Sequence, residues 1–329
     1  MTGPCRARNA AWFALSCTLA FALGCGDDDA RALDGGLDAG VDASPAPRDA
    51  GRDLGSDSGP LCDPTGAALP DPLICNGHAE LCTRSYADVS FAMAHNAMNS
   101  EEEGWTAPNQ TTRLWAQLER GIRGFMLDTY TLRGETLLCH GSCALGKRPF
   151  VDALRDLRMF LDCHPAEVIT LILEAHIDEA TTARAFEDAG LLPYLDEQSS
   201  DAVAWPTLGE MIRSGRRLVV FTESSEVTLP WHHQAYAFMW DTNYAARSAS
   251  DFRCDVLRGS RGHQLFLLNH FLTAPIASLS LAEMVNHDPL LIDRARACQS
   301  DTDDLPNFVA LDFVELGDLL TTVDALNRL

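Results

Sequence analysis

Five side chains of this sequence combine the groups needed for proton-transfer catalysis beside a metal ion. His95 and His140 are imidazoles, which titrate near neutral pH, so one ring can take a proton while the other gives one. Asn96, Asp128 and Glu174 carry amide and carboxylate oxygens, which favour Ca²⁺ or Mg²⁺ over zinc. Glu174 also ends an apolar run, where a carboxylate is costly unless it binds a partner. The set predicts acid–base chemistry assisted by a hard divalent cation.

Polar side chains recur at the ends of apolar runs that alternate with helical patterns from about residue 61 onward. The predicted strands span 88–95, 124–130, 136–140, 168–175, 217–223, 236–240, 264–269 and 308–312. This alternation favours a single α/β fold, an irregular (β/α) TIM-type barrel, with a doubly wound open sheet as the alternative. The C-terminal strand ends of such a barrel converge on one mouth. Besides the five residues above, those ends carry Glu223, Asn269, His270 and Asp312.

Helical patterns fill several of the gaps between these strands. Pro149 is followed by apolar residues at helical spacing through 151–161, and proline is common at the first position of a helix. Residues 207–214 and 316–329 show similar spacing. These segments are the helices expected to surround the barrel.

The first 60 residues predict an exported protein. Arg6 and Arg8 precede an apolar run that ends at Gly24-Cys25 and is too short to cross a bilayer as a helix. A small residue followed by cysteine resembles a bacterial lipoprotein signal, which would anchor Cys25 in the cell envelope. An ordinary cleaved signal peptide, giving a periplasmic or secreted protein, is the alternative. We expect a signal over 1–25, a disordered Asp/Gly/Ala-rich tether over 26–60 and the barrel over 61–329.

Composition agrees with export and limits the partners. Eight cysteines follow the predicted signal, an even number that is typical of disulfide bonds, although eight cysteines allow 105 pairings. Cys139 and Cys143 have a spacing that zinc tolerates, but no second close pair accompanies them. The formal net charge of −22 argues against nucleic acid and against broad adhesion to anionic membranes.

Seven segments, taken in their order and spacing, resemble a known enzyme family. They read MAHNAMNSEEEGW (93–105), PNQ (108–110), QLERGIRGFMLDTY (117–130), LLCHGSC (137–143), FLDCHPAEVITLILE (160–174), LLNHFLT (267–273) and PNFVALDFVE (306–315). Together they are similar to the catalytic domain of phosphatidylinositol-specific phospholipases C. The likeness is closest to the bacterial and plant branch of phospholipase C-like phosphodiesterases, and it covers about residues 84–329.

The resemblance implies a role for each histidine. His95 falls on the first catalytic histidine and His140 on the second, while Asp312 resembles the carboxylate that orients the first histidine. The implied reaction is cleavage of a phosphodiester by an internal hydroxyl. One histidine takes the hydroxyl proton and the other protonates the leaving oxygen. The implied products are diacylglycerol and a cyclic inositol phosphate.

The resemblance also implies a metal site. Asn96, Asp128 and Glu174 fall on calcium ligands of the metal-dependent branch. Met126 departs from the pattern, because it shares a strand face with Asp128 and stands where the animal enzymes place a ligand carboxylate. The metal-independent enzymes carry an arginine at the position of Asp128, and this sequence does not. Metal dependence is therefore implied, with Ca²⁺ favoured and Mg²⁺ as the alternative.

Other polar residues have less specific assignments. Lys147 and Arg148 lie beside the second histidine and could contact phosphate. Glu223, Asn269 and His270 could line a head-group pocket or make ordinary strand-end hydrogen bonds. The remaining histidines are expected to be ordinary surface residues, and they are His164, His176, His232, His233, His263 and His287.

The leading hypothesis is a monomeric phosphodiesterase that acts on a phospholipid or glycolipid, with the membrane reached through an anchor at Cys25. One alternative is a barrel enzyme of the glycerophosphodiesterase or sphingomyelinase D kind. Those enzymes resemble each other in a His-Arg-Gly near the first strand, where this sequence has His95-Asn96-Ala97. The other alternative is a surface binding barrel whose active site has decayed, and Met126 is the feature in its favour.

Overall fold

The computed structural model describes residues 72–329. The predicted signal, the predicted tether and the predicted lipid anchor at Cys25 lie outside the described residues, as does the start of the predicted barrel segment. Within residues 72–329, no helix combines the length and the apolar character that a membrane crossing requires.

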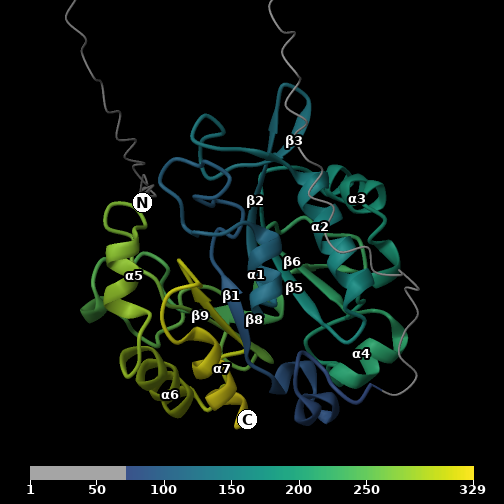
Figure 1. Cartoon of the computed structure of the whole chain (residues 1–329). Coiled ribbons are helices and arrows are strands. Elements are labelled where there is room, and N and C mark those ends of the chain that lie inside the picture. Colours follow the sequence, from purple (N-terminus) through teal and green to yellow (C-terminus); the bar gives the residue numbers. More distant parts are fainter. Residues whose placement is uncertain (1–71) are drawn as a thin grey trace, which may run out of the picture. The chain divides into compact units, whose positions relative to one another are not determined.

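Eight parallel strands form a curled sheet with helices around it, which is the TIM-type arrangement expected from the sequence (Figure 1). These strands are β1 (Phe91–Ala94), β2 (Gly124–Leu132), β5 (Ile169–Ala175), β6 (Leu218–Thr222), β7 (His232–Gln234), β8 (Met239–Asp241), β9 (Leu265–Asn269) and β10 (Phe308–Leu311). Their hydrogen-bonded order is β7-β6-β5-β2-β1-β10-β9-β8. Within the described residues, the first and last strands therefore lie side by side, and β7 and β8 are the two ends of the order.

Two further strands extend the sheet beyond the barrel. They are β3 (Glu135–Leu138) and β4 (Arg148–Pro149). β3 pairs antiparallel with the long C-terminal part of β2, and β4 pairs antiparallel with β3. Arg133 and Gly134 form the turn between β2 and β3 with φ angles of 52° and 85°, the positive values that a tight hairpin turn requires. In Figure 1 this hairpin stands above the barrel.

The helices pack on the outer face of the sheet because strand residues alternate between two cores. Met93, Phe221 and Phe308 face inward and pack against one another inside the barrel. Phe125 and Leu127 face outward, into a second core that includes the apolar side of the helix over Phe150–Cys163. The α-helices of the described residues are α1 (Leu114–Arg120), α2 (Phe150–Cys163), α3 (Glu179–Asp188), α4 (Leu208–Ser214), α5 (Leu279–Val285), α6 (Leu290–Thr302) and α7 (Leu319–Asn327).

The predicted helices agree with three of these elements. The segment after Pro149 is α2, and Pro149 itself is the residue before the first helical position. Thr207 begins α4 with a capping box, because its hydroxyl accepts from the Glu210 amide while the Glu210 carboxylate accepts from the Thr207 amide. The C-terminal helix is α7, which is shorter than the predicted 316–329.

Seven of the eight predicted strands are barrel strands, and one prediction was wrong. The run at 136–140 is β3, which folds back on β2 and leaves the barrel. The barrel strand that the sequence did not reveal is β7, which has three residues and two histidines and so lacks an apolar run. His232 and His233, predicted to be surface residues, are buried in β7 with 2% and 4% of their surface exposed. The predicted strand 236–240 is β8 preceded by a 3-10 turn over Ala235–Ala237.

Disulfide bonds confirm the expected use of cysteine. They link three pairs of the described residues, Cys75–Cys82, Cys139–Cys143 and Cys254–Cys298, and Cys163 is disulfide-bonded as well. Cys139 and Cys143 bond to each other, so the zinc interpretation of their spacing was wrong.

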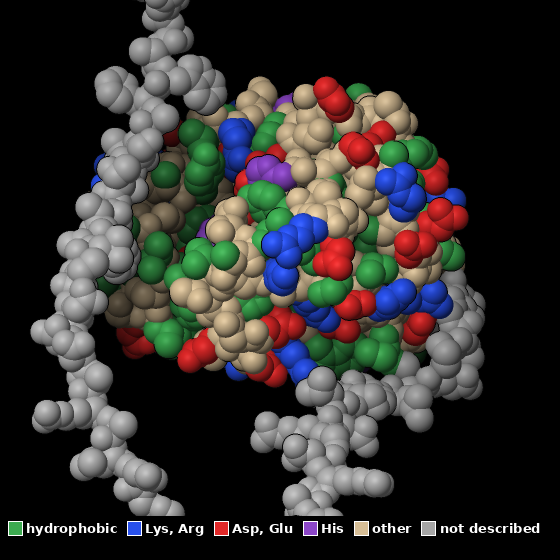
Figure 2. Space-filling model, turned by 90° about the horizontal axis from the view of Figure 1, so that it is seen from above, with side chains coloured by type: hydrophobic (Ala, Val, Ile, Leu, Met, Phe, Trp, Pro, Cys, Tyr) green, Lys and Arg blue, Asp and Glu red, His purple; other side chains and the backbone are tan. Residues whose placement is uncertain are grey.

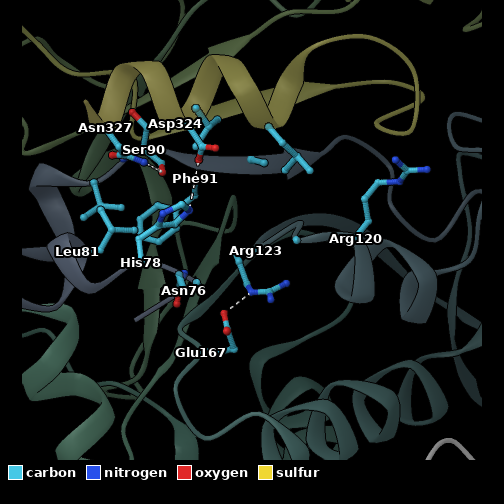
Figure 3. Close-up of a pocket in the computed structure, with 16 residues that line it drawn as sticks. Asn76, His78, Leu81, Ser90, Phe91, Arg120, Arg123, Glu167, Asp324 and Asn327 are labelled. Atoms are coloured by element: carbon cyan, nitrogen blue, oxygen red, sulfur yellow. Dashed lines mark hydrogen bonds and ion pairs between the residues drawn. The ribbon is translucent and has the colours of Figure 1, made fainter. Parts of the chain in front are cut away.

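The floor of the barrel contains a pocket of about 250 Å³ (Figure 3). It lies where β1 and β2 begin, at the end opposite to the C-terminal strand ends. Its polar groups are largely engaged with one another. Arg123 Nε donates to Glu167 at 2.7 Å, and Asn327 exchanges two hydrogen bonds with the backbone of Ser90. The floor therefore contributes stability, as the N-terminal face of a barrel usually does.

Candidate active site

His95 lies at the C-terminal end of β1, where one backbone contact and two ring contacts hold it. Its backbone N–H donates to Leu311 O on β10 at 2.9 Å. Its Nδ1 lies 2.8 Å from Oδ1 of Asp312, and its ring stacks on Phe271 at a centroid distance of 3.8 Å. Asp312 is buried and, when ionised, can only accept, so Nδ1 carries the hydrogen and Nε2 presents a lone pair. This is the arrangement of a general base.

Asn96 brings the two predicted histidines to one point. Its Nδ2 lies 3.1 Å from Nε2 of His95 and 3.3 Å from Nε2 of His140. Asn96 has a φ of 45°, a left-handed conformation that asparagine tolerates better than most residues. Both rings therefore face the same small region of the mouth, although the residues are 45 positions apart in the chain.

Two buried asparagines join the histidines from behind. Asn109 Nδ2 donates to the same Asp312 oxygen that contacts His95, at 2.9 Å. Asn99 Nδ2 donates to Asn109 Oδ1 at 2.6 Å and lies 3.0 Å from Nδ1 of His140. A continuous chain of contacts thus runs from one imidazole to the other. Neither asparagine was among the predicted site residues, although Asn99 lies in the segment MAHNAMNSEEEGW and Asn109 in PNQ.

A cavity of about 240 Å³ opens beside the two histidines. Trp105, Leu145, Pro275 and Ile276 supply much of its apolar lining. Trp105 is buried and packs against Gly146, where an added Cβ would lie 2.3 Å from the indole ring. In Figure 2, which looks down on this face, histidine side chains lie beside a hollow bordered by hydrophobic groups. The two histidines therefore border a space with a largely apolar lining.

The predicted metal-ligand carboxylates lie on neighbouring strands. Asp128 on β2 is in register with Glu174 on β5, and Glu223 follows the next strand, β6. Asp128 is buried, and its pKa is raised well above the usual range by burial and then by the charges of Glu174 and Glu223. Glu174 is half exposed and contacts His176 Nε2 at 2.8 Å.

The chemistry of this donor set fits a hard cation, because the charges of Glu174 and Glu223 raise the pKa of Asp128 and a positive charge between the carboxylates would relieve that repulsion. Two hard carboxylate oxygens and the Asn96 amide match the ligand preference of Ca²⁺. As the described residues are arranged, no three of their His, Cys, Asp and Glu side chains form a ready metal-binding group. Met126 packs against the inner core beneath Asp128 and adds no oxygen ligand.

The opposite side of the mouth is organised around Arg258, which the sequence analysis missed. Its Nη1 lies 3.0 Å from Glu223 and its Nη2 lies 2.5 Å from Asp241. The guanidinium also stacks on the rings of Tyr236 and Tyr244, at 4.5 and 4.7 Å from their centroids. Arg258 comes from the long loop between β8 and β9, so no strand-end pattern pointed to it.

The remaining predicted binding residues have different surroundings. Lys147 is exposed, whereas Arg148 is engaged by Asp156 at 2.7 Å and by Glu103 at 3.4 Å. Asn269 is buried at the end of β9 and donates to Thr242 O at 2.7 Å. The head-group assignment of His270 was wrong. The structure buries it behind β9, with Nε2 on Val285 O and Nδ1 on Arg294 Nη1, because it follows Asn269 on the other face of the strand.

Comparison with known proteins shows the family of this chain. The family model described as PI-PLC X matches residues 81–327. The chain belongs to the PI-PLC X family. Its family relatives include a PI-PLC X domain-containing protein 1 of Arthroderma benhamiae, 30% identical over 78% of this chain and 90% of that protein. An uncharacterized secreted protein of the same fungus is 26% identical over 74% of this chain and 61% of its own length.

Solved structures show that proteins with little sequence identity to this chain have the same barrel fold. The phosphatidylinositol-specific phospholipase C from Listeria monocytogenes aligns with a TM-score of 0.52, covering 75% of this chain and 96% of that chain. The two sequences are 15% identical, so this likeness concerns the fold. It confirms the predicted TIM-type barrel.

Proposed function

We propose that this chain is an exported phosphodiesterase that cleaves phosphatidylinositol-type lipids or glycolipids into diacylglycerol and a cyclic inositol phosphate. The observation that carries the proposal is the meeting of two imidazole Nε2 atoms at Asn96, one of them on a ring held by a buried carboxylate. Family membership and the shared barrel support a phospholipase C-type reaction.

His95 is the general base in this proposal. Its Nε2 accepts the proton of the inositol hydroxyl next to the phosphate, and the freed oxygen forms a new bond to phosphorus. The positive charge that develops on the ring is stabilised by Asp312 at Nδ1, 2.8 Å away. Phe271 stacks on the ring and holds its plane.

His140 is the general acid. As the bond from phosphorus to the glycerol oxygen breaks, Nε2 of His140 gives its proton to that oxygen, which leaves as the hydroxyl of diacylglycerol. Burial lowers the pKa of His140, and the nearby His95 lowers it further, so the ring releases its proton readily. Both proton transfers are then complete, and solvent restores the starting protonation of the two rings.

A Ca²⁺ ion, with Mg²⁺ as the alternative, would be held by Asp128, Glu174 and Asn96, and it would neutralise phosphate charge. Away from that site, Arg258 and the two tyrosines that stack on it offer a positive charge and an aromatic surface at the side of the mouth where a head group would lie. Export is part of the proposal because of the N-terminal signal pattern and the disulfides of the barrel.

The test is turnover of phosphatidylinositol in mixed micelles, with products followed by ³¹P NMR. We expect a cyclic phosphodiester from the wild type, a loss of about 10²–10⁴-fold in kcat for His140→Ala and for His95→Ala, and inhibition by a chelator. Activity that survives unchanged in His140→Ala would remove the mechanism. Binding without turnover in the wild type would instead support the alternative of a surface binding barrel.

A further inference from the structure

A disulfide bond encloses the proposed general acid. Cys139 and Cys143 are four positions apart, with their Cα atoms at 4.9 Å, so the bond closes a small ring that contains His140. Cys139 is fully buried at the end of β3, and its N–H donates to Asp128 O at 3.2 Å. One end of the ring is therefore fixed to the sheet.

The backbone of the ring has few other contacts. Ser142 N donates to His140 O at 2.7 Å, which is a bond inside the loop, and the Tyr130 hydroxyl contacts the backbone of Gly141. Gly141 has a φ of 66°, and a glycine in this region leaves the chain wide conformational freedom. Without the disulfide, the turn after His140 would be held only loosely.

The two histidines are thus positioned by different means. His95 continues a barrel strand, and its backbone is fixed by β10. His140 lies beyond the end of β3 and outside the ladder of the sheet. Asn96 and Asn99 reach the His140 ring at 3.3 and 3.0 Å, but amide contacts at such distances hold a ring only when its Cα stays in place.

We propose that the Cys139–Cys143 disulfide is a positioning element for the general acid, holding Nε2 of His140 where the leaving oxygen departs. This inference rests on the proposed function. The disulfide takes the place of the strand pairing that fixes His95, and it acts through His140 without touching the substrate.

A second disulfide provides a matched control. Cys75 and Cys82 are seven positions apart with a Cα distance of 5.1 Å, and Cys75 is fully buried, like Cys139. This bond lies at the other end of the barrel, where the neighbouring His78 and Leu81 line the floor pocket (Figure 3). Removing it perturbs a short cross-link of similar kind far from the histidines.

The experiment compares C139A/C143A with C75A/C82A on two substrates. The first is phosphatidylinositol, whose glycerol oxygen needs a proton to leave. The second is the 4-nitrophenyl ester of inositol phosphate, whose leaving group departs without a general acid. We expect C139A/C143A to lose about 10²-fold in kcat on the lipid, since a small misplacement of a catalytic group has that cost. On the nitrophenyl ester we expect its kcat to stay within about 3-fold of wild type, because general acid catalysis is then worth little.

Two outcomes would overturn the inference. Equal losses of kcat on both substrates would mean that the disulfide stabilises the fold or the active-site mouth in general. An unchanged kcat on the lipid would mean that Asn96 and Asn99 alone position His140. C75A/C82A should change neither activity by more than about 3-fold. If C139A/C143A does not fold, the same pair of assays is run on folded wild type after mild reduction and alkylation, with the modified cysteines mapped by mass spectrometry. Failure of the proposed function differs from all of these, because the wild type then turns over neither substrate.

Discussion

Asp312→Asn is the sharpest test of how His95 works as a base. Oδ1 of Asp312 accepts from His95 Nδ1 at 2.8 Å and from Asn109 Nδ2 at 2.9 Å, and the carboxylate is only 5% exposed. The amide has almost the same size, so packing is preserved. Because both donors contact the same oxygen, the amide oxygen can take the place of Oδ1 and accept from both, so the variant loses only the negative charge beside His95.

Loss of the carboxylate charge weakens His95 as a base. When Nε2 takes the substrate proton, the ring becomes an imidazolium, and a neutral amide stabilises that positive charge far less than a carboxylate does. We expect kcat to fall by about 10²–10⁴-fold, the usual worth of one general base, with little change in KM. Raising the pH should not restore the rate, because an amide gains no negative charge at any pH in this range.

The assay is initial-rate turnover of phosphatidylinositol between pH 5 and pH 9, with circular dichroism to verify the fold. Asp304→Asn is the matched control, because Asp304 accepts from the indole N–H of Trp240 at 2.9 Å, a contact that the amide oxygen preserves. That variant should keep wild-type kcat. A kcat for Asp312→Asn within about 3-fold of wild type would refute the reasoning that the Asp312 charge stabilises His95 as it takes the proton.

Three further predictions concern the metal, a buried ion pair and acid stability. Calcium should raise the melting temperature of the wild type, and Asp128→Asn should abolish that rise in scanning calorimetry; an equal rise in both would place the ion elsewhere. Arg258→Met should cost about 3–5 kcal/mol in urea unfolding because Asp241, fully buried, loses its partner, whereas Arg155→Ala at an exposed pair should cost under about 1 kcal/mol. Burial lowers the pKa of His233 to about 4, below its unfolded value near 6.5, so the unfolded chain binds its proton first as pH falls. The stability that this group contributes is complete above pH 6.5 and should decrease by about 3 kcal/mol toward pH 4. His233→Gln should reduce this dependence of the unfolding free energy on pH, and an unchanged dependence in the variant would contradict the prediction.

The strand ends were predictable because inward-facing residues repeat at every second position. His95, Asp128 and Asp312 all continue that period past the last apolar residue of a strand, so the pattern that marks the core also marks the mouth. The prediction that residues 136–140 form a barrel strand failed because β3 pairs antiparallel with β2 above the barrel. An apolar run does not show whether its strand will pair parallel or antiparallel. β7 could not be predicted from the apolar pattern because its buried residues are histidines.

The second half of the site was out of reach of sequence patterns. Asn99 and Asn109 lie in a loop whose path brings them together, and no periodicity records such a meeting. Arg258 comes from a long loop between β8 and β9, so its pairing with Glu223 and Asp241 could not be predicted from the strand pattern. His270 shows the opposite error, since a polar residue one position past an inward-facing one points behind the strand.

The pairing of β1 with β10 links catalysis to completion of the polypeptide. His95 and Asp312 are 217 residues apart, and they meet only when the last strand of the chain docks beside the first. Such long-range parallel pairing forms late in folding, because its loop-closure entropy must be overcome before the contacts form. A fragment released before residue 312, by a stop codon or by a protease, holds both imidazoles and lacks the carboxylate that makes one of them a base. In the proposed mechanism, a chain that ends before residue 312 would therefore lack an oriented base and would be inert.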